Sequence, residues 1–161
     1  MKGSPKVIEQ LQKLLSYELA SVHQYFIHSE MYEDMGLMAL YERIHHEMQE
    51  ETEHAQLLIK RILFLESKPD VQTMAPLMVG SEVPEMLEND LKMEHEGRAI
   101  IIDGIEICEK EKDFESREIL EKLLDDTEED HIYWLERQLR LIKMIGLPNY
   151  LQKQIAGSGE G

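Results

Sequence analysis

Two short stretches of the chain, Glu51-Thr52-Glu53-His54 and Glu128-Glu129-Asp130-His131, share the pattern Glu-x-x-His. A lone glutamate precedes each of them, because Glu18 lies 33 residues before Glu51 and Glu94 lies 34 residues before Glu128. This spacing fits two helical hairpins, each with one glutamate on its first helix and a Glu-x-x-His pair on its second. One glutamate and one Glu-x-x-His pair from each of the two hairpins together make up the ligand set of a two-metal carboxylate site inside a four-helix bundle.

The Glu-x-x-His pattern is informative only together with its surroundings. With 25 glutamates and 7 histidines in 161 residues, random placement gives roughly one such pair, and any two residues three apart share a helix face. A third pair, Glu42-x-x-His45, begins nine residues before Glu51 and so lies on the opposite face of the same helix. We expect this third pair to be solvated. The other two have leucine neighbours, and buried carboxylates and imidazoles need a partner such as a metal ion.

The residue types also indicate which metal the site prefers. Carboxylate oxygen combined with imidazole nitrogen suits iron, whereas all-oxygen sites favour magnesium or calcium and thiolates favour zinc. We therefore predict a non-haem di-iron site in which one carboxylate from each pair bridges two ions about 3.5–4 Å apart. The assignment places Glu51 and Glu128 as bridges, Glu18 and His54 on one iron, and Glu94 and His131 on the other. The alternative is that these six are only salt-bridged polar residues of the core.

Composition excludes several other classes of protein. A formal net charge of -16 argues against binding of nucleic acid or of an anionic membrane through a basic surface. Cys108 is the only cysteine, so the chain has no internal disulfide and no Cys-x-x-Cys pair for zinc or a rubredoxin-type iron. The first ten residues lack the apolar core of a signal peptide, and no run of about 20 apolar residues follows. We expect a cytoplasmic protein.

Prolines and glycines predict an all-α fold with four long helices and a short one. Ser4 and Pro5 open a helix to about residue 34, and further helices are expected at about 38–66, 85–110, from the turn at 112–113 to 145, and 149–155. The prolines and glycine between 66 and 85 forbid regular helix there. A connection that long fits a crossover that travels the length of the bundle. We expect one domain over residues 1–156 and a disordered tail at 157–161.

Other residues near the predicted ligands are weaker candidates. Tyr25 lies seven residues after Glu18 on the same stripe, where it could hydrogen-bond a site carboxylate, donate an electron, or simply be buried. Glu47 is nearly in line with His54 and could contact the ligands. His46 and Glu50 form an i, i+4 pair on a different stripe and are either a secondary iron site or solvated residues. His23, His28, His45 and His95 are expected to be surface or interface residues.

Beyond the six ligands, nearly the whole chain resembles the bacterioferritins and related bacterial ferritins, members of the ferritin-like superfamily. The similar stretches are Met1–Gly3, Gln24–Phe26, Arg61–Glu66, His131–Glu136 and Asn149–Gln152. The resemblance implies a ferritin-like four-helix bundle with a short fifth helix near the four-fold channels of a 24-subunit shell. It also implies a ferroxidase that oxidises Fe(II) with O2 or H2O2 and stores Fe(III) mineral inside, with a ferredoxin-type reductant as a possible partner. The neighbourhood of His46 and Glu50 then faces the cavity of the shell.

One position departs from the bacterioferritin pattern. That family binds haem between two subunits on paired methionines, each two residues before the second-helix histidine, and this chain has Thr52 there. A hydroxyl is a poor substitute for a thioether, so we expect no haem b in a shell made of this chain alone. Met48 and Met31 are weaker candidates, because ten methionines are more simply explained by packing. A mixed shell with a haem-binding subunit is the alternative.

Three functional classes remain. The favoured one is an iron-storage ferritin subunit with a di-iron ferroxidase centre. The second is a stand-alone rubrerythrin-like di-iron peroxidase or oxidase, which would use the same set of ligands. The terminal helix and the missing rubredoxin cysteines count against it. The third is a metal-free helical interaction protein, which the duplicated ligand set disfavours.

Overall fold

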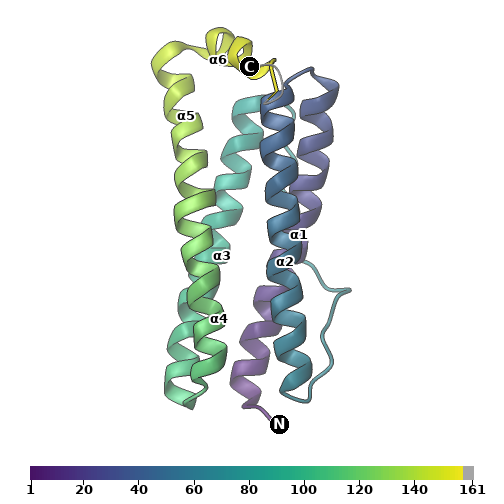
Figure 1. Cartoon of the computed structure of the whole chain (residues 1–161), viewed down its shortest axis with the longest axis vertical. Helices are drawn as coiled ribbons and strands as arrows, with labels where there is room; N and C mark the ends of the chain where they lie inside the picture. Colours follow the sequence, from purple (N-terminus) through teal and green to yellow (C-terminus); the bar gives the residue numbers. More distant parts are fainter. Residues whose placement is uncertain (158–161) are drawn as a thin grey trace.

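Four long helical rods stand side by side in the computed structural model, which describes residues 1–157 (Figure 1). The first three rods are α1 (Pro5–Asp34), α2 (Met38–Phe64) and α3 (Val83–Glu111). The fourth consists of α4 (Phe114–Asp125), the π-helix η1 (Asp126–Ile132) and α5 (Tyr133–Ile145), and the short α6 (Leu147–Gln154) follows. No strand occurs within residues 1–157. The all-α prediction and the number of rods are confirmed, with most helix ends within about two residues of those expected.

The order of the rods follows the predicted topology. α1 and α2 form one antiparallel pair, and α3 and the fourth rod form the other (Figure 1). Gly36, with φ of +80°, turns the chain between α1 and α2, and Lys112, with φ of +58°, ends α3. Asp113 then caps α4, because its carboxylate accepts a hydrogen bond from the Ser116 N–H at 3.0 Å. Ser4 sits at the N-cap position of α1, but its hydroxyl donates to Glu111 and does not cap the helix.

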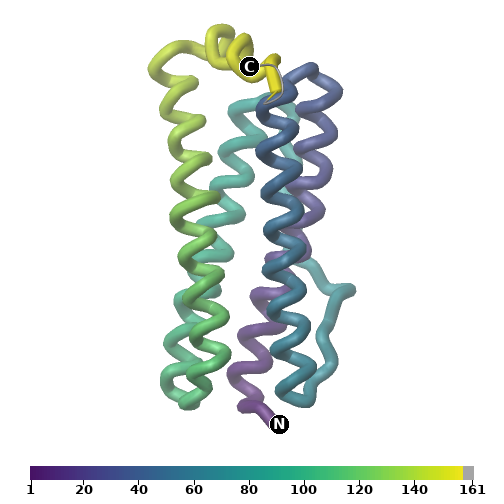
Figure 2. The backbone as a smooth tube through the Cα atoms, in the orientation of Figure 1, coloured from purple at the N-terminus to yellow at the C-terminus, as the bar shows by residue number. Residues whose placement is uncertain are grey.

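The connection between α2 and α3 climbs from one end of the bundle to the other along α1 (Figure 2). Backbone amides tie it to that helix: Ala75 N–H donates to the Ser16 carbonyl at 3.1 Å, and Met78 N–H donates to Gln24 Oε1 at 2.9 Å. Gly80 N–H donates to Nε2 of the buried His28 at 3.1 Å. These bonds satisfy the extended backbone without regular structure. The predicted crossover along the bundle is therefore confirmed.

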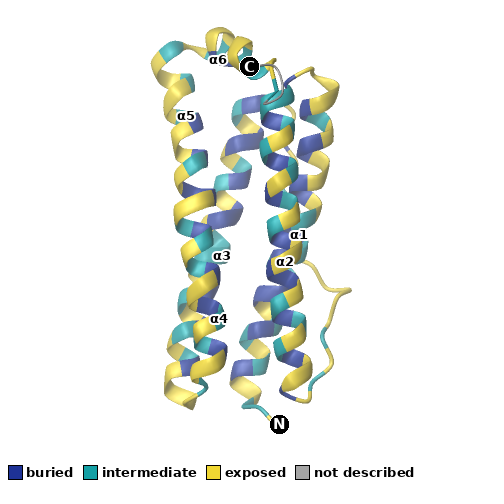
Figure 3. Cartoon of the chain, viewed as in Figure 1, coloured by how far each residue is buried: buried dark blue, intermediate teal, exposed yellow. Residues whose placement is uncertain are grey.

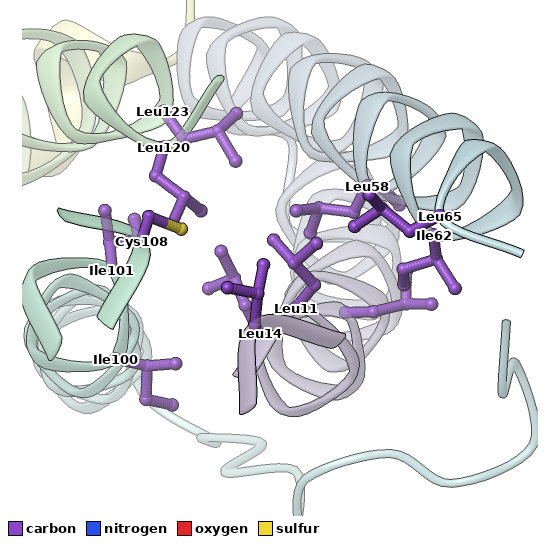
Figure 4. Close-up of a cluster of buried hydrophobic side chains, with 13 residues drawn as sticks. Leu11, Leu14, Leu58, Ile62, Leu65, Ile100, Ile101, Cys108, Leu120 and Leu123 are labelled. Carbon is purple, nitrogen blue, oxygen red and sulfur yellow. The ribbon is translucent and has the colours of Figure 1, made fainter. Parts of the chain in front are cut away.

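Two apolar cores fill the bundle. Buried residues alternate with exposed ones along every rod (Figure 3). The lower core lies near the N-terminal end of α1 and includes Leu11, Leu14, Leu58, Ile62, Leu120 and Leu123 (Figure 4). The upper core lies near α6 and includes Tyr32, Leu40, Ile44, Met86, Leu87 and Tyr150. Burial of each such side chain contributes about 1.5–3 kcal/mol. Tyr150 attaches α6 to α5, because its hydroxyl donates to Gln138 Oε1 at 2.9 Å.

The fourth rod differs from its prediction. A continuous α-helix was expected up to Ile145, whereas residues Asp126–Ile132 form a π-helix. The second half of the chain carries one residue more between its lone glutamate and its Glu-x-x-His pair than the first half. A π-helix absorbs one extra residue in its wider turn and lets the helices on both sides keep their packing. The predicted disordered tail lies outside the described residues, apart from Gly157, which sits against α2 beside Glu42.

Candidate metal centre

Five of the six predicted ligands meet in a polar layer between the lower and upper cores. On each rod they lie, along the chain, between residues of the two apolar clusters. All five are 5% exposed or less: Glu18 on α1, Glu51 and His54 on α2, Glu94 on α3, and His131 on η1. Ionisable groups this deeply buried are costly unless they pair or bind a metal. The layer is therefore the candidate metal centre.

The first half of the centre consists of Glu18, Glu51 and His54, whose ligand atoms all lie within 4.8 Å of one another. His54 Nδ1 faces Glu18 Oε2 at 3.6 Å and Glu51 Oε2 at 3.5 Å, yet it is buried with no hydrogen-bond partner. The other ring nitrogen, Nε2, lies 3.0 Å from Asp126 Oδ2. A metal ion between the three ligands would satisfy Nδ1, while Asp126 would hold the ring in the tautomer that ligation needs.

The second half consists of Glu51, Glu94 and His131, again within 4.8 Å of one another. His131 Nδ1 lies 2.9 Å from Glu51 Oε1 and 3.2 Å from Glu94 Oε1. The two imidazole rings of the halves stack with centroids 6.0 Å apart and an interplanar angle of 24°. Glu51 belongs to both halves and directs one oxygen to each. That is the arrangement expected of a bridging carboxylate.

The protonation of the cluster reflects its burial and its crowded charges. Burial and the charge of Glu51 raise the pKa of Glu18 well above its usual range. Burial also favours neutral Glu51, but hydrogen bonds from Glu18 and His131 hold its pKa well below the usual range. Burial acts to lower the pKa of His54, yet the carboxylates of Glu18 and Glu51 that face its Nδ1 raise it to about 11. The centre without metal therefore holds protons that an entering cation must displace.

A third group lies on the outer side of His131. Its Nε2 is 2.9 Å from Glu50 Oε2 and 2.6 Å from Glu47 Oε2, and the latter oxygen is buried without a hydrogen bond. The ligand atoms of Glu47, Glu50 and His131 also lie within 4.8 Å of one another, close enough to hold a metal ion. A hydrogen bond with His131 lowers the pKa of Glu50 to about 2. Arg43 pairs with Glu47, and the exposed His46 lies 3.1 Å from Glu50. A small surface cavity opens over this group.

Comparison with known proteins agrees with this geometry. The profile of the ferritin-like domain matches residues 8–145. The chain belongs to the ferritin family. It is 58% identical to a bacterial ferritin of Synechocystis over 97% of this chain and all of that protein, and 57% identical to one of Pseudomonas aeruginosa over 96% and 100%. It is 44% identical to a bacterioferritin of Brucella melitensis over 99% of both chains. The resemblance noted from short motifs thus covers the whole bundle of this ferritin-family chain.

The sixth predicted ligand, Glu128, is not part of either half. Its side chain is 40% exposed and accepts a hydrogen bond from Arg98 Nε at 2.6 Å. The π-helix explains this placement. Residues three apart share a face in an α-helix, but they diverge in the wider π turn, where residues five apart align. Asp126, five residues before His131, is the carboxylate of η1 that reaches the edge of the centre, where it contacts Nε2 of His54. The role of Glu128 as a ligand stays a prediction.

The weaker candidates are distributed between the centre and the surface. Tyr25 is buried, and its hydroxyl donates to Glu94, as one of the sequence alternatives anticipated. Burial and the charge of Glu94 raise the pKa of this tyrosine well above its usual range.

Thr52 is exposed, and its hydroxyl donates to the Met48 carbonyl at 2.9 Å. Met48 and Met31 are partly buried against the upper core. The third Glu-x-x-His pair, Glu42 and His45, lies outside the three groups.

Sequence reasoning missed several contacts. Asp126 and Arg98 are ordinary charged residues in the sequence, and only the π-helix gives them their roles. His28 was expected to be a surface or interface residue but is completely buried within the bundle, with Nδ1 2.8 Å from Asp90 Oδ1. The one available signal was Asp90 itself, an acidic residue among Met86, Leu87 and Leu91. A membrane-spanning helix was not expected, and within residues 1–157 none is long and apolar enough to cross a bilayer.

Proposed function

We propose that this chain is the subunit of an iron-storage ferritin whose buried carboxylate–histidine centre oxidises Fe(II) to Fe(III). The observation that supports this most directly is the pair of groups that share Glu51, since each presents two carboxylates and one imidazole to a common space. His54 Nδ1, buried without a hydrogen bond, faces that space. Oxygen and nitrogen donors of this kind fit iron.

Each residue would have its own role in such a centre. Fe(II) is the substrate, and Glu18 with His54 would hold one ion while Glu94 with His131 hold the other, with Glu51 between them. Each Fe(II) gives up one electron, and two electrons with two protons reduce O2 to H2O2, or H2O2 to two waters. Carboxylates favour Fe(III) over Fe(II) because they neutralise its additional charge. Tyr25, hydrogen-bonded to Glu94, orients that carboxylate and is placed to donate an electron.

The third group would serve passage of iron from the centre. Glu47 and Glu50 face Nε2 of His131, whose Nδ1 faces the centre. An ion leaving the centre would therefore meet carboxylates on the other side of the same imidazole. His46, exposed beside Glu50, extends this set toward the surface. We assign these residues a transit or nucleation role.

Assembly into a 24-subunit shell in the cytoplasm is part of the proposal. The relatives align over their full length, including the segment that forms α6 here. Large apolar side chains are exposed near α6, with Met144 72% and Ile155 57% accessible. Side chains of this kind commonly mark protein interfaces. A ferredoxin-type protein is the class of reductant we expect for release of stored iron.

Haem is not expected in a shell of this chain alone. Thr52 stands at the position of the haem methionine, and its hydroxyl is engaged by the Met48 carbonyl of its own helix. A mixed shell, in which another subunit supplies methionine, is the way in which haem b could be present. A bis-methionine absorption spectrum of the purified homomer reconstituted with haem would contradict this expectation.

The rubrerythrin-like alternative predicts the same ligands but no storage shell. Size-exclusion chromatography with mass determination separates the two, since the shell requires a species of 24 copies of the 18.9 kDa chain. A monomer or dimer as the sole species would favour the stand-alone oxidase. The third class, a metal-free interaction protein, would show no iron oxidation.

The central test is iron binding and oxidation by ligand variants. Glu18→Ala and His131→Ala should each lose one of two tightly bound metals per chain. Each should also slow Fe(II) oxidation, followed by absorbance in air, by more than the roughly 10–100-fold that loss of a ligand's hydrogen-bond partner costs. The matched control is Glu42→Ala with His45→Ala, which removes the Glu-x-x-His pair on the opposite helix face. Full oxidation and two metals in the first two variants would refute the proposal.

A further inference from the structure

Glu128, which lies outside both halves of the centre, pairs with an arginine on the neighbouring rod. Arg98 lies four residues after Glu94 on α3, and its Nε donates to Glu128 Oε1 at 2.6 Å. Both side chains are about two-fifths exposed, at 41% and 40%. The pair therefore lies at the rim of the bundle, next to the residue that supplies a ligand to the second half. Nothing in the proposed function uses Arg98.

Each half of the centre presents two carboxylates and one imidazole, but the halves differ in where the neighbouring carboxylates lie. On the His54 side, Glu18 and Glu51 face Nδ1, and Asp126 accepts from Nε2. On the His131 side, Glu94 and the shared Glu51 face Nδ1, and Nε2 is surrounded by Glu47 and Glu50. The additional carboxylate of η1 points to Arg98. An ion on the His131 side would gain a third carboxylate only if Glu128 left its arginine.

We propose that Arg98 is a positioning residue that competes with the ion on the His131 side for the carboxylate of Glu128. The inference rests on the proposed function, because it assumes two ions in the centre. Its consequence is ordered binding: the ion between Glu18 and His54 binds first, and the second binds more weakly because it obtains the carboxylate of Glu128 only by displacing the guanidinium. The centre then holds one ion at low iron concentration and two at high concentration.

The size of the effect follows from the exposure of the pair. Exposed ion pairs contribute about 0–1 kcal/mol, which corresponds to at most about fivefold in a binding constant. Such pairs are also weakened by salt, because mobile ions screen exposed charges. The competition should therefore be measurable at low ionic strength and diminish as salt is added. A structural role of Arg98 in holding α3 against η1 would not show this dependence.

The test is anaerobic titration of the metal-free protein with Co2+, read by absorption spectroscopy and calorimetry. Arg98→Met should raise the affinity for the second ion about two- to fivefold and leave the first unchanged. The gain should shrink in high salt. Arg117→Met is the matched control, because Arg117 pairs with Glu109 and Glu121 at the surface and its loss changes net charge equally. Glu128→Gln should lower the affinity for the second ion, and in the Glu128→Gln protein the Arg98→Met change should no longer raise that affinity.

The outcomes separate the inference from the function on which it rests. The inference would be overturned if the parent, Arg98→Met and Arg117→Met proteins all bound two ions and had the same affinity for the second. The ferroxidase proposal would remain intact. The same holds if Glu128→Gln binds the second ion as the parent does. Failure of the parent protein to bind two ions would instead refute the proposed function.

Discussion

The two halves of the centre carry the same pattern on helices of different geometry. On α2, Glu51 and His54 lie three apart in a regular α-helix, and both side chains are buried in the centre. On η1, Glu128 and His131 are also three apart, but only His131 is buried. The difference teaches that a motif places its side chains only for a given helical turn. One additional residue, absorbed as a π-helix, exchanges Glu128 for Asp126.

The strongest way to break the comparison is to remove the residue that the π-helix brings in. Asp126→Ala should lower the affinity of the His54 side for metal about 10–100-fold, because the ring loses the acceptor that fixes its tautomer. Co2+ titration measures this directly. Glu129→Ala is the control, since it removes a charge from an exposed residue of the same helix. Equal affinities in the two variants would show that Asp126 does not orient His54.

The second prediction uses pH to sharpen the role of His54. Its pKa of about 11 means that Nδ1 carries a proton in the metal-free protein, because the facing carboxylates of Glu18 and Glu51 favour this charge although burial acts against it. Metal affinity should therefore rise about tenfold per pH unit for each proton displaced. Calorimetry in buffers of different ionisation enthalpy should detect the released proton. An affinity independent of pH between 6.5 and 8.5 would contradict this.

The same shift predicts the opposite trend for the protein without metal. A pKa raised above the unfolded value stabilises the fold fully below about pH 6.5. That contribution is lost as pH rises toward about 11. The melting temperature of the metal-free protein should thus fall above pH 6.5, while the increment added by Co2+ grows. Parallel melting curves across this range would show that His54 does not gain a proton on folding.

The smallest expected effect comes from making the second half like the first. Deleting Thr127 restores a spacing of 33 residues between Glu94 and the following glutamate and should return η1 to α-helix. That glutamate would then share a face with its histidine, and second-ion affinity should rise about two- to fivefold as the pair with Arg98 is lost. Co2+ titration and a crystal structure provide the readouts. Thr127→Ala, which keeps the length and the π turn, should behave as the parent; a continuous α-helix with unchanged affinity would contradict the explanation.

Much of the architecture was predictable because it depends on local pattern. Pro5, Gly36 and Gly146 mark helix ends through their restricted or permissive backbone, and these ends appear near the predicted positions. The prolines in the long segment after α2 prevent it from forming a helix. An extended crossover along the bundle was therefore the connection that fitted between the second and third helices. Rejection of Glu42 and His45 required only the angle between residues nine apart. His28 failed as a prediction because burial of a histidine depends on its partner, Asp90, which lies 62 residues away.

The sequence by itself predicted the five side chains that gather in the candidate metal centre, since regular helices repeat their faces at fixed spacing and apolar neighbours show which face is buried. Only the tertiary structure decided the sixth position. Whether one extra residue ends up in a loop, a bulge or a π turn depends on which choice keeps α4 and α5 packed on the rest of the bundle. That balance involves contacts between distant rods. It turned Asp126 toward His54 and left Glu128 to Arg98.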